Sequence, residues 1–191
     1  MEKENLKGFD AHEYRPIIRP QTEELLVELI KKYRPKHVLE IGTFLGYSAG
    51  LMCEVDENMH ITTLEKDEQN VRDAKENLKR FGERVEVICC DAFDFLKNTD
   101  KQFDFIFLDG PKGQYVNYLP YLKKLLETGG VLMADDVLFY GMVSSDGFVK
   151  HKHRSIVEHL RTFLQNLQSD PDFKTQIFDF EDGVSVSVKI K

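Results

Sequence analysis

The chain lacks the features of a membrane protein and those of a disulfide-stabilised protein. It has three cysteines, Cys53, Cys89 and Cys90. An odd count with two adjacent members is no disulfide framework, so we expect core packing, with one of the adjacent pair facing the core. No apolar run approaches the length of a membrane span, and the polar segment Met1–Asn5 has no signal-peptide character. We therefore expect a cytoplasmic protein that does not bind membranes.

The chain also lacks internal repeats, low-complexity tracts and any linker long enough to divide it. Its 191 residues suit one domain with a substantial core, so we predict a single domain over residues 1–191. The net charge of −7 argues against non-specific nucleic-acid binding. One local exception is a cationic run, Lys150-His151-Lys152-His153-Arg154.

Apolar runs alternate with helical patterns along the chain. The predicted strands are 37–41, 60–64, 85–89, 103–108, 131–134, 174–180 and 184–190, and the predicted helices are 22–33, 47–54, 68–81, 93–97, 115–127 and 155–168. Glycines at 82 and at 129–130 are expected to end two of these helices. The alternation predicts an α/β fold with a mostly parallel seven-stranded sheet, helices on both faces and a C-terminal antiparallel hairpin. In the last strand, alternating valine and serine predict one buried face.

A nucleotide-type cofactor site is indicated after the first strand. In a doubly wound sheet, ligands bind at the carboxyl ends of the strands. The turn from Gly42 through Thr43 to Gly46 is G-x-x-x-G and lacks the second glycine of a dinucleotide-binding turn, which lets the backbone approach a pyrophosphate. This disfavours NAD and is compatible with S-adenosylmethionine. A tight strand-to-helix turn without a ligand would have a similar sequence.

Acidic residues on the first three strands support such a site. Glu65 ends the second strand and can accept hydrogen bonds from both ribose hydroxyls, although it can also be a solvated loop residue. Asp91 and Ala92 follow the third strand, where they can face adenine, and Asp91 can cap the next helix. Glu40 lies inside the first strand, so it needs a partner such as the ammonium group of the cofactor.

Three further aspartates follow two later strands. Asp109 follows strand 103–108, and Asp135 and Asp136 follow strand 131–134. If these strands are parallel neighbours, the three carboxylates meet at one edge of the sheet and repel one another. A hard divalent cation such as Mg²⁺ neutralises such a group with the oxygen ligands that it prefers. The sequence therefore predicts a metal site formed by these three residues.

Together these motifs resemble the metal-dependent O-methyltransferases related to catechol and caffeoyl-CoA O-methyltransferases. The resemblance rests on Val38-Leu39-Glu40-Ile41-Gly42, Gly46-Tyr47-Ser48, Phe107-Leu108-Asp109-Gly110-Pro111-Lys112 and Ala134-Asp135-Asp136-Val137-Leu138. It implies a Rossmann-like methyltransferase fold, S-adenosylmethionine and Mg²⁺ or a similar cation as cofactors, and often a homodimer. Asp136 replaces the usual asparagine of the family, which should tighten metal binding or raise a carboxylate pKa.

The resemblance also implies roles for individual residues. Lys112 and Asp109 are the expected catalytic residues, with Lys112 as general base or oxyanion stabiliser and its pKa lowered by the metal. Ile18 and Arg19 are expected in a segment over the methionine end of the cofactor. The full expected set for cofactor binding is Ile18, Glu40, Gly42, Thr43, Gly46, Ser48, Glu65, Asp91, Ala92 and Asp109.

A narrower resemblance is to the bacterial tRNA 5-hydroxyuridine methyltransferases. It rests on Lys112-Gly113-Gln114-Tyr115, Asp136-Val137-Leu138-Phe139-Tyr140-Gly141, Asp170-Pro171-Asp172-Phe173 and Asp182-Gly183-Val184-Ser185-Val186-Ser187. It implies methylation of the wobble 5-hydroxyuridine of tRNA to 5-methoxyuridine. Phosphate contacts would come from the cationic run, Lys150, Lys152 and Arg154 with its two histidines, and the patch could be extended by Arg15, Arg19, Lys31, Lys32 and Arg34. A base would stack on Phe139, Tyr140 or Phe148. The alternative acceptor is a small catechol-like or phenolic molecule, whose adjacent hydroxyls chelate a metal equally well.

Overall fold

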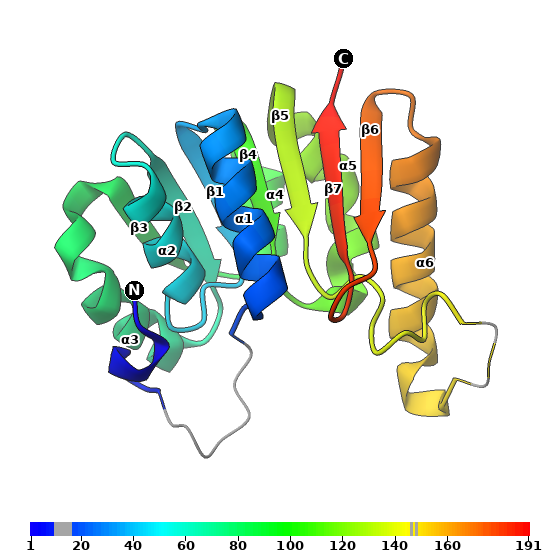
Figure 1. The fold of residues 1–191 in the computed structure, drawn as a ribbon, viewed down its shortest axis with the longest axis horizontal. Helices are drawn as coiled ribbons and strands as arrows, with labels where there is room; N and C mark the ends of the chain where they lie inside the picture. Colours follow the sequence, from blue (N-terminus) through cyan, green and yellow to red (C-terminus); the bar gives the residue numbers. More distant parts are fainter. Residues whose placement is uncertain (10–16, 146, 148) are drawn as a thin grey trace. The chain divides into compact units, whose positions relative to one another are not determined.

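The computed structural model describes residues 1–9, 17–145, 147 and 149–191. These residues form two compact units, Met1–Thr99 and Asp100–Lys191, whose elements are labelled in Figure 1. Arg15 and Phe148, named above for RNA contacts, lie outside the described residues. The single domain, the homodimer and the cytoplasmic location stay predictions. Among the described residues, no helix is long and apolar enough to cross a membrane.

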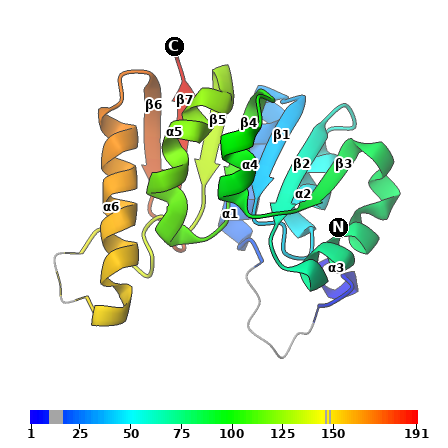
Figure 2. The same cartoon turned by 180° about the vertical axis from the view of Figure 1, so that it is seen from behind.

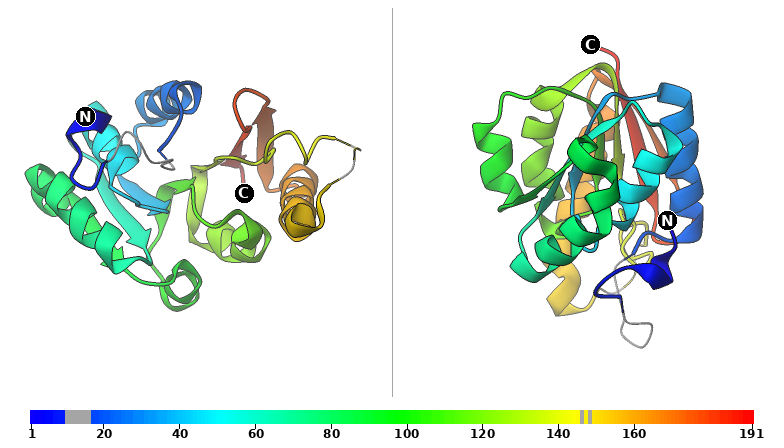
Figure 3. Two further views of the ribbon diagram at one scale, coloured as in Figure 1. Left: turned by 90° about the horizontal axis from the view of Figure 1, so that it is seen from below. Right: turned by 90° about the vertical axis from the view of Figure 1, so that its left-hand side faces the viewer.

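Unit 1 is built on three parallel strands in the order β3-β2-β1. They are β1 (His37–Ile41), β2 (His60–Glu65) and β3 (Val85–Cys89), and the helices are η1 (Lys3–Asn5), α1 (Pro20–Tyr33), α2 (Tyr47–Val55), α3 (Glu68–Leu78), η2 (Lys79–Arg84) and α4 (Ala92–Asn98). Helices α1 and α2 lie on one face of these strands in Figure 1, and α4 lies on the other face in Figures 2 and 3. Because the strands are parallel, their carboxyl ends lie at one edge of the unit.

Unit 2 contains four strands in the order β4-β5-β7-β6. They are β4 (Phe103–Leu108), β5 (Leu126–Ala134), β6 (Phe173–Phe178) and β7 (Val184–Lys189), and the helices are η3 (Lys112–Gln114), α5 (Tyr115–Leu125), η4 (His151–His153) and α6 (Arg154–Ser169). Strand β4 is parallel to β5, whereas β7 runs antiparallel to both β5 and β6. Helices α5 and α6 cover the face of these strands that is turned to the viewer in Figure 2.

The last strand is buried on both faces, so the prediction of one buried face is wrong. Val184, Ser185, Val186 and Ser187 are all buried. In the sheet, β7 lies between β5 and β6, so neighbouring strands flank it on both sides. The serines of this strand are therefore small buried side chains, and their alternation with valine does not indicate a solvent-exposed face.

The glycines at 129 and 130 lie inside a strand instead of ending a helix. Helix α5 ends at Leu125, and β5 begins at Leu126. The β4–β5 register shifts between Phe103 and Phe105, opposite this stretch. A side chain at Gly130 would come within 3.0 Å of the carbonyl oxygens of Glu127 and Asp104. The two glycines thus permit a bulge with close backbone approach.

Two smaller predictions also need correction. Helix α3 ends at Leu78 and continues as the 3₁₀ turn η2, which contains Gly82 in a left-handed conformation with φ of 59°. Of the adjacent cysteines, Cys89 is exposed and Cys90 is half-buried, so neither is a core residue, whereas Cys53 is buried. The cause is that β3 is the first strand in the sheet order, with a neighbour on one side only.

Candidate active site

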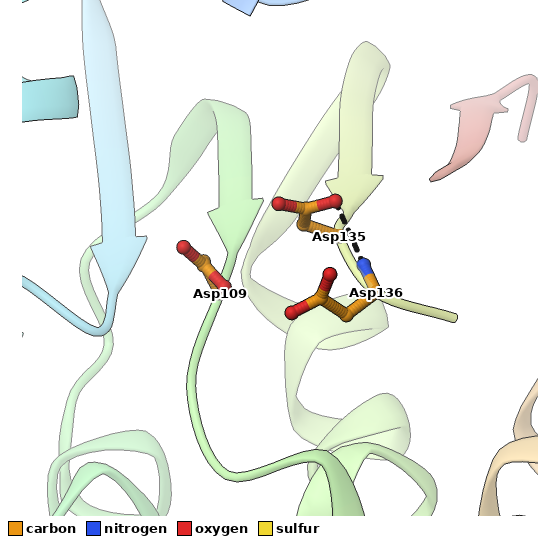
Figure 4. Close-up of side chains that lie close together, drawn as sticks. All are labelled: Asp109, Asp135 and Asp136. Atoms are coloured by element: carbon orange, nitrogen blue, oxygen red, sulfur yellow. Dashed lines mark hydrogen bonds between the residues drawn. The ribbon is translucent and has the colours of Figure 1, made fainter. Parts of the chain in front are cut away.

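The structure brings the three predicted metal ligands together in unit 2. Asp109 follows β4, and Asp135 and Asp136 follow β5, its parallel neighbour. One carboxylate oxygen from each lies within 4.8 Å of the others, as Figure 4 shows. The main-chain N–H of Asp136 donates to Oδ1 of Asp135 at 2.8 Å, which fixes one carboxylate relative to the next. Three carboxylates converging on one point form a suitable donor set for a hard divalent cation.

Burial and mutual repulsion make this cluster electrostatically unusual. Asp135 is buried, and burial together with the charges of Asp109 and Asp136 raises the pKa of Asp135 to about 7. A perturbed carboxylate beside two others is the kind of group that functional sites contain. A bound cation would reverse this penalty, because it stabilises the ionised form.

Lys112 supplies the positive charge of this cluster in the structure. Its Nζ lies 2.6 Å from Oδ1 of Asp109 and 3.2 Å from Oδ2 of Asp136. Burial lowers the pKa of Lys112, but the nearby acidic groups, Asp109 first, raise it further, so the pKa lies well above its usual value. The lowered pKa predicted above refers to the metal-loaded protein and stays a prediction.

Tyr115 is a site residue that sequence reasoning missed. It is fully buried at the start of α5, and its hydroxyl donates to the carbonyl oxygens of Leu108 at 3.0 Å and of Asp135 at 3.2 Å. Burial raises the pKa of Tyr115 above its ordinary value, so the hydroxyl keeps its proton and remains a donor. It thereby ties the ends of β4 and β5 together. In the sequence it appears only as the last residue of the stretch Lys112-Gly113-Gln114-Tyr115, where no role is predicted for it.

In unit 1, the G-x-x-x-G turn joins β1 to α2. Gly42 and Gly46 both have positive φ, 102° and 81°, which glycine adopts without strain. The main-chain N–H groups of Gly42 and Thr43 donate to the carbonyl of Leu64, and the hydroxyl of Thr43 lies 2.5 Å from that of Thr63. A side chain at Gly46 would lie 2.6 Å from Leu78, so this position requires glycine for packing as well.

Glu65 holds this turn from the end of β2. Its Oε2 accepts from the N–H of Phe44 at 2.8 Å, and its Oε1 accepts from the N–H groups of Lys66 and Asp67. The carboxylate is therefore fixed rather than a freely solvated loop group. Three of the roughly four acceptor sites of the carboxylate are used by these N–H groups, so Oε2 keeps one site for a ribose hydroxyl. The ribose contact itself stays a prediction.

Asp91 is the N-cap of α4, which confirms the prediction that it can cap this helix. Its side chain accepts from the N–H of Phe93 at 2.9 Å and pairs with Lys66 at 2.9 Å. Lys66 first, and then the Phe93 hydrogen bond, hold the pKa of Asp91 below its ordinary value. Ala92 is the first residue of α4 and is half-buried. An adenine contact by Asp91 and Ala92 stays a prediction.

Glu40 is fully buried in β1, as expected, and has polar partners within unit 1. The hydroxyl of Ser48 donates to its Oε1 at 2.5 Å, and that of Thr63 donates to its Oε2. The structure thus connects two residues of the predicted cofactor set, Glu40 and Ser48, directly. Ile18 is buried just before α1, and its carbonyl accepts from Lys3; Arg19 is the N-cap of that helix.

The cationic run lies at the start of α6, in unit 2. Lys150, Lys152 and Arg154 are exposed. The ring of His153 packs edge-on against Phe139, with centroids 5.4 Å apart, so the run contacts the loop that follows Asp136. Lys152 and Arg154 flank His153 in the chain, and any RNA contact by them stays a prediction.

Comparison with known proteins agrees with this geometry. A family model described as O-methyltransferase matches residues 4–190. A caffeoyl-CoA O-methyltransferase from Populus kitakamiensis is 29% identical, over 83% of this chain and 72% of the relative. A Staphylococcus aureus structure, assigned as a caffeoyl-CoA O-methyltransferase, is 31% identical with a TM-score of 0.84, over 91% and 85% of the two chains. An S-adenosylhomocysteine-bound Podospora anserina methyltransferase is 26% identical with a TM-score of 0.81, over 92% and 81%.

These similarities establish the fold of the chain and the family to which it belongs. The predicted fold is confirmed as a Rossmann-like α/β methyltransferase fold with a mostly parallel seven-stranded sheet and a C-terminal antiparallel hairpin. The chain belongs to the S-adenosylmethionine-dependent O-methyltransferase family, of the caffeoyl-CoA O-methyltransferase type. The narrower likeness to tRNA 5-hydroxyuridine methyltransferases is not among these findings.

Proposed function

We propose that this enzyme methylates one hydroxyl of a small phenolic molecule with two adjacent hydroxyls, and that it uses Mg²⁺ or a similar divalent cation. The observation that carries the proposal is the set of three carboxylates within 4.8 Å, with Lys112 2.6 Å from one of them. Adjacent oxygens are a chelating pair for a hard cation. The caffeoyl group named for the relatives carries two adjacent phenolic hydroxyls.

Each unit contributes separate residues to the proposed reaction. In unit 1, Glu65 would bind the ribose and Asp91 and Ala92 the adenine, and the main chain of the turn Gly42–Gly46 would contact the adenosyl donor. In unit 2, Asp109, Asp135 and Asp136 would hold the cation. When bound, the cation lowers the pKa of the acceptor hydroxyl and fixes its orientation.

In this reaction, Lys112 would assist removal of the hydroxyl proton of the acceptor or stabilise the negative charge left on its oxygen. The reaction breaks the carbon–sulfur bond of the sulfonium and forms a carbon–oxygen bond, so the acceptor must lose its hydroxyl proton. Lys112 either takes that proton or stabilises the oxyanion that remains. Its ion pairs with Asp109 and Asp136 hold its amine at the cluster for both roles.

The test is a methyl-transfer assay with labelled S-adenosylmethionine and a panel of acceptors. We expect transfer to catechol-type acceptors in Mg²⁺ or Mn²⁺, no transfer in EDTA, and little transfer to phenols with one hydroxyl. Asp135→Ala should lose metal-dependent turnover, whereas Asp100→Ala, an exposed acid elsewhere in unit 2, should keep it. Turnover that is unchanged by EDTA would contradict the metal site.

A second acceptor, the wobble 5-hydroxyuridine of tRNA, is favoured by one observation. The exposed cations of the 150–154 run flank His153, whose ring packs against Phe139 of the loop that carries Asp136. An exposed aromatic on the same loop, Tyr140, is available to stack on a base. The absence of tryptophan does not argue against this.

The two acceptors are separated in one parallel assay. Hydroxyuridine-containing tRNA and catechols are offered at equal concentrations over a range of salt. Label in tRNA that disappears as salt rises, and that falls in a Lys152→Ala, Arg154→Ala double variant, would establish the RNA acceptor, because phosphate contacts are salt-sensitive. Transfer to catechols alone, unchanged in that double variant, would establish the small-molecule acceptor.

A further inference from the structure

The loop after β5 holds an unusual backbone. Asp136, Phe139 and Tyr140 have φ of 55°, 44° and 55°, in the left-handed region that residues with side chains seldom occupy. Such conformations persist only where the surroundings hold them, and they gather at functional sites. The first of these residues is a proposed metal ligand, so whatever holds the loop also places its carboxylate.

The turn between β6 and β7 holds this loop by three hydrogen bonds. The N–H of Val137 donates to the carbonyl of Gly183 at 2.9 Å, and the N–H of Leu138 donates to the carbonyl of Asp182 at 2.8 Å. The N–H of Tyr140 donates to Oδ1 of the Asp182 side chain at 2.7 Å. Asp182 is only 7% exposed, although it is a charged residue at a turn.

Close packing accompanies these hydrogen bonds. A side chain at Gly183 would lie 2.2 Å from Leu138, and Gly183 itself has φ of 78°. The two loops therefore touch at a place where one of them has no side chain. Main-chain carbonyls of the β6–β7 turn bind the loop at Val137 and Leu138. Farther along the loop, at Tyr140, the acceptor is the side chain of Asp182.

We propose that Asp182 is a positioning residue for the metal site. Its carboxylate holds the amide of Tyr140, and this keeps the loop in the left-handed conformation that sets Asp136 beside Asp109 and Asp135. A hydrogen bond from a main-chain N–H to a side-chain oxygen offsets part of the cost of a strained loop, and it is lost when that oxygen is removed. The inference rests on the proposed function, because it assigns Asp182 to the cation site of that function.

The experiment measures Mn²⁺ affinity of the full chain by titration calorimetry, with folding followed by circular dichroism. We expect Asp182→Ala to weaken Mn²⁺ binding about tenfold or more. Asp182→Asn, which keeps an oxygen acceptor at Oδ1, should stay within about threefold of the parent protein. The matched control is Asp179→Ala, an exposed acid in the same β6–β7 connection, which should bind Mn²⁺ as the parent does.

A rescue variant tests the backbone part of the inference. Glycine adopts positive φ without strain. Tyr140→Gly in the Asp182→Ala background should therefore recover much of the lost Mn²⁺ affinity, which a general loss of stability would not explain. If Asp182→Ala does not fold, Asp182→Glu takes its place, because the longer side chain displaces the acceptor oxygen and should lose affinity similarly.

The outcomes separate this inference from the proposed function. Failure of the parent protein to bind Mn²⁺ would overturn the proposed function. Equal Mn²⁺ affinity in the parent and the Asp182→Ala variant would overturn the positioning role alone. Equal losses in Asp182→Asn and Asp182→Ala would also overturn it, since the charge of Asp182, and not its hold on Tyr140, would then act on the cation.

Discussion

The side-chain nitrogen of Lys112 lies 2.6 Å from Oδ1 of Asp109, and it also pairs with Asp136. The ammonium thus contacts carboxylates that the proposed cation would use. A lysine and a divalent cation at the same carboxylates repel each other, so the lysine should weaken cation binding even though it serves the reaction.

This relationship predicts opposite effects of one substitution on binding and on turnover. Lys112→Met should raise Mn²⁺ affinity several-fold, because it removes a competing charge. It should lower kcat by about a hundredfold or more, because it removes the proton acceptor or oxyanion partner. Calorimetry with Mn²⁺ and methyl-transfer kinetics measure the two effects.

The control for this prediction is Lys123→Met. Lys123 is an ion-paired lysine of α5 in the same unit, paired with Asp170 and Asp172. We expect its replacement to change neither Mn²⁺ affinity nor kcat by more than about twofold. A parallel fall of affinity and kcat in Lys112→Met would show that Lys112 supports the site structurally instead of competing with the cation.

The raised pKa of Asp135 predicts how pH acts on the metal-free protein. Its pKa in the folded state is about 7, above the value of about 3.9 for an unfolded chain. The folded state therefore binds this proton more tightly than the unfolded chain does. Protonation of Asp135 thus stabilises the folded protein fully below about pH 4, and this stabilisation is lost as the pH rises to about 7. The difference in Tm between the parent and Asp135→Asn, which does not titrate, should change across this window.

Metal binding should show the reverse trend with pH. A carboxylate binds a cation only after it loses its proton, so apparent Mn²⁺ affinity should rise as the pH increases toward and through about 7. Added Mn²⁺ should then remove the pH dependence of Tm that Asp135 causes. Apparent affinity that is constant over this range would contradict the coupled titration.

Much of the fold could be predicted because the strands are short apolar runs with polar boundaries. The structure has β1, β3 and β4 at the predicted residues 37–41, 85–89 and 103–108. Parallel pairing then places residues after β4 and β5 together, which is why three aspartates distant in the sequence could be assigned to one cluster. The metal ligands could be predicted from the parallel strand order and from the charge of three neighbouring carboxylates, and not from their spacing in the sequence alone.

The supporting residues could not be predicted in the same way. Tyr115 and Asp182 act through main-chain groups at positions 108, 135 and 140, and main-chain groups leave no sequence pattern. Glycine is also ambiguous, because Gly129 and Gly130 suit a helix end and a bulge equally. The two faces of β7 depend on its neighbours in the sheet, which local alternation does not encode.

The hydroxyl of Tyr115 gives a prediction about the coupling of β4 and β5. Tyr115→Phe removes the donor to the carbonyl oxygens of Leu108 and Asp135 but keeps the ring. Leaving a buried acceptor without that donor should lower the free energy of unfolding by about 1–3 kcal/mol. We also expect Mn²⁺ affinity to fall a few-fold, since Asp135 would be held less firmly.

Urea denaturation followed by circular dichroism measures the stability of this variant. Tyr33→Phe, at the end of α1 in unit 1, is the control for removing a tyrosine hydroxyl away from the cluster. It should leave Mn²⁺ affinity unchanged. If Tyr115→Phe binds Mn²⁺ as tightly as the parent, the hydroxyl contributes to folding but not to the metal site.

The glycine turn of unit 1 gives the last prediction, through a pair of matched substitutions. Gly46 and Gly129 both have left-handed φ, 81° and 87°. A side chain at Gly46 would lie 2.6 Å from Leu78, whereas nothing lies within 4 Å at Gly129. Gly129→Ala should therefore show only the backbone cost, about 1 kcal/mol. Gly46→Ala should lose about 1–3 kcal/mol more from overpacking.

The same pair also tests the cofactor turn. Overpacking at Gly46 would displace the start of α2, which carries Ser48 and its hydrogen bond to Glu40. We expect Gly46→Ala to weaken S-adenosylhomocysteine binding about tenfold in calorimetry, while Gly129→Ala binds it as the parent does. Equal affinities in a folded Gly46→Ala variant would place the adenosyl site away from this turn, because a turn that binds the cofactor cannot shift without changing that affinity.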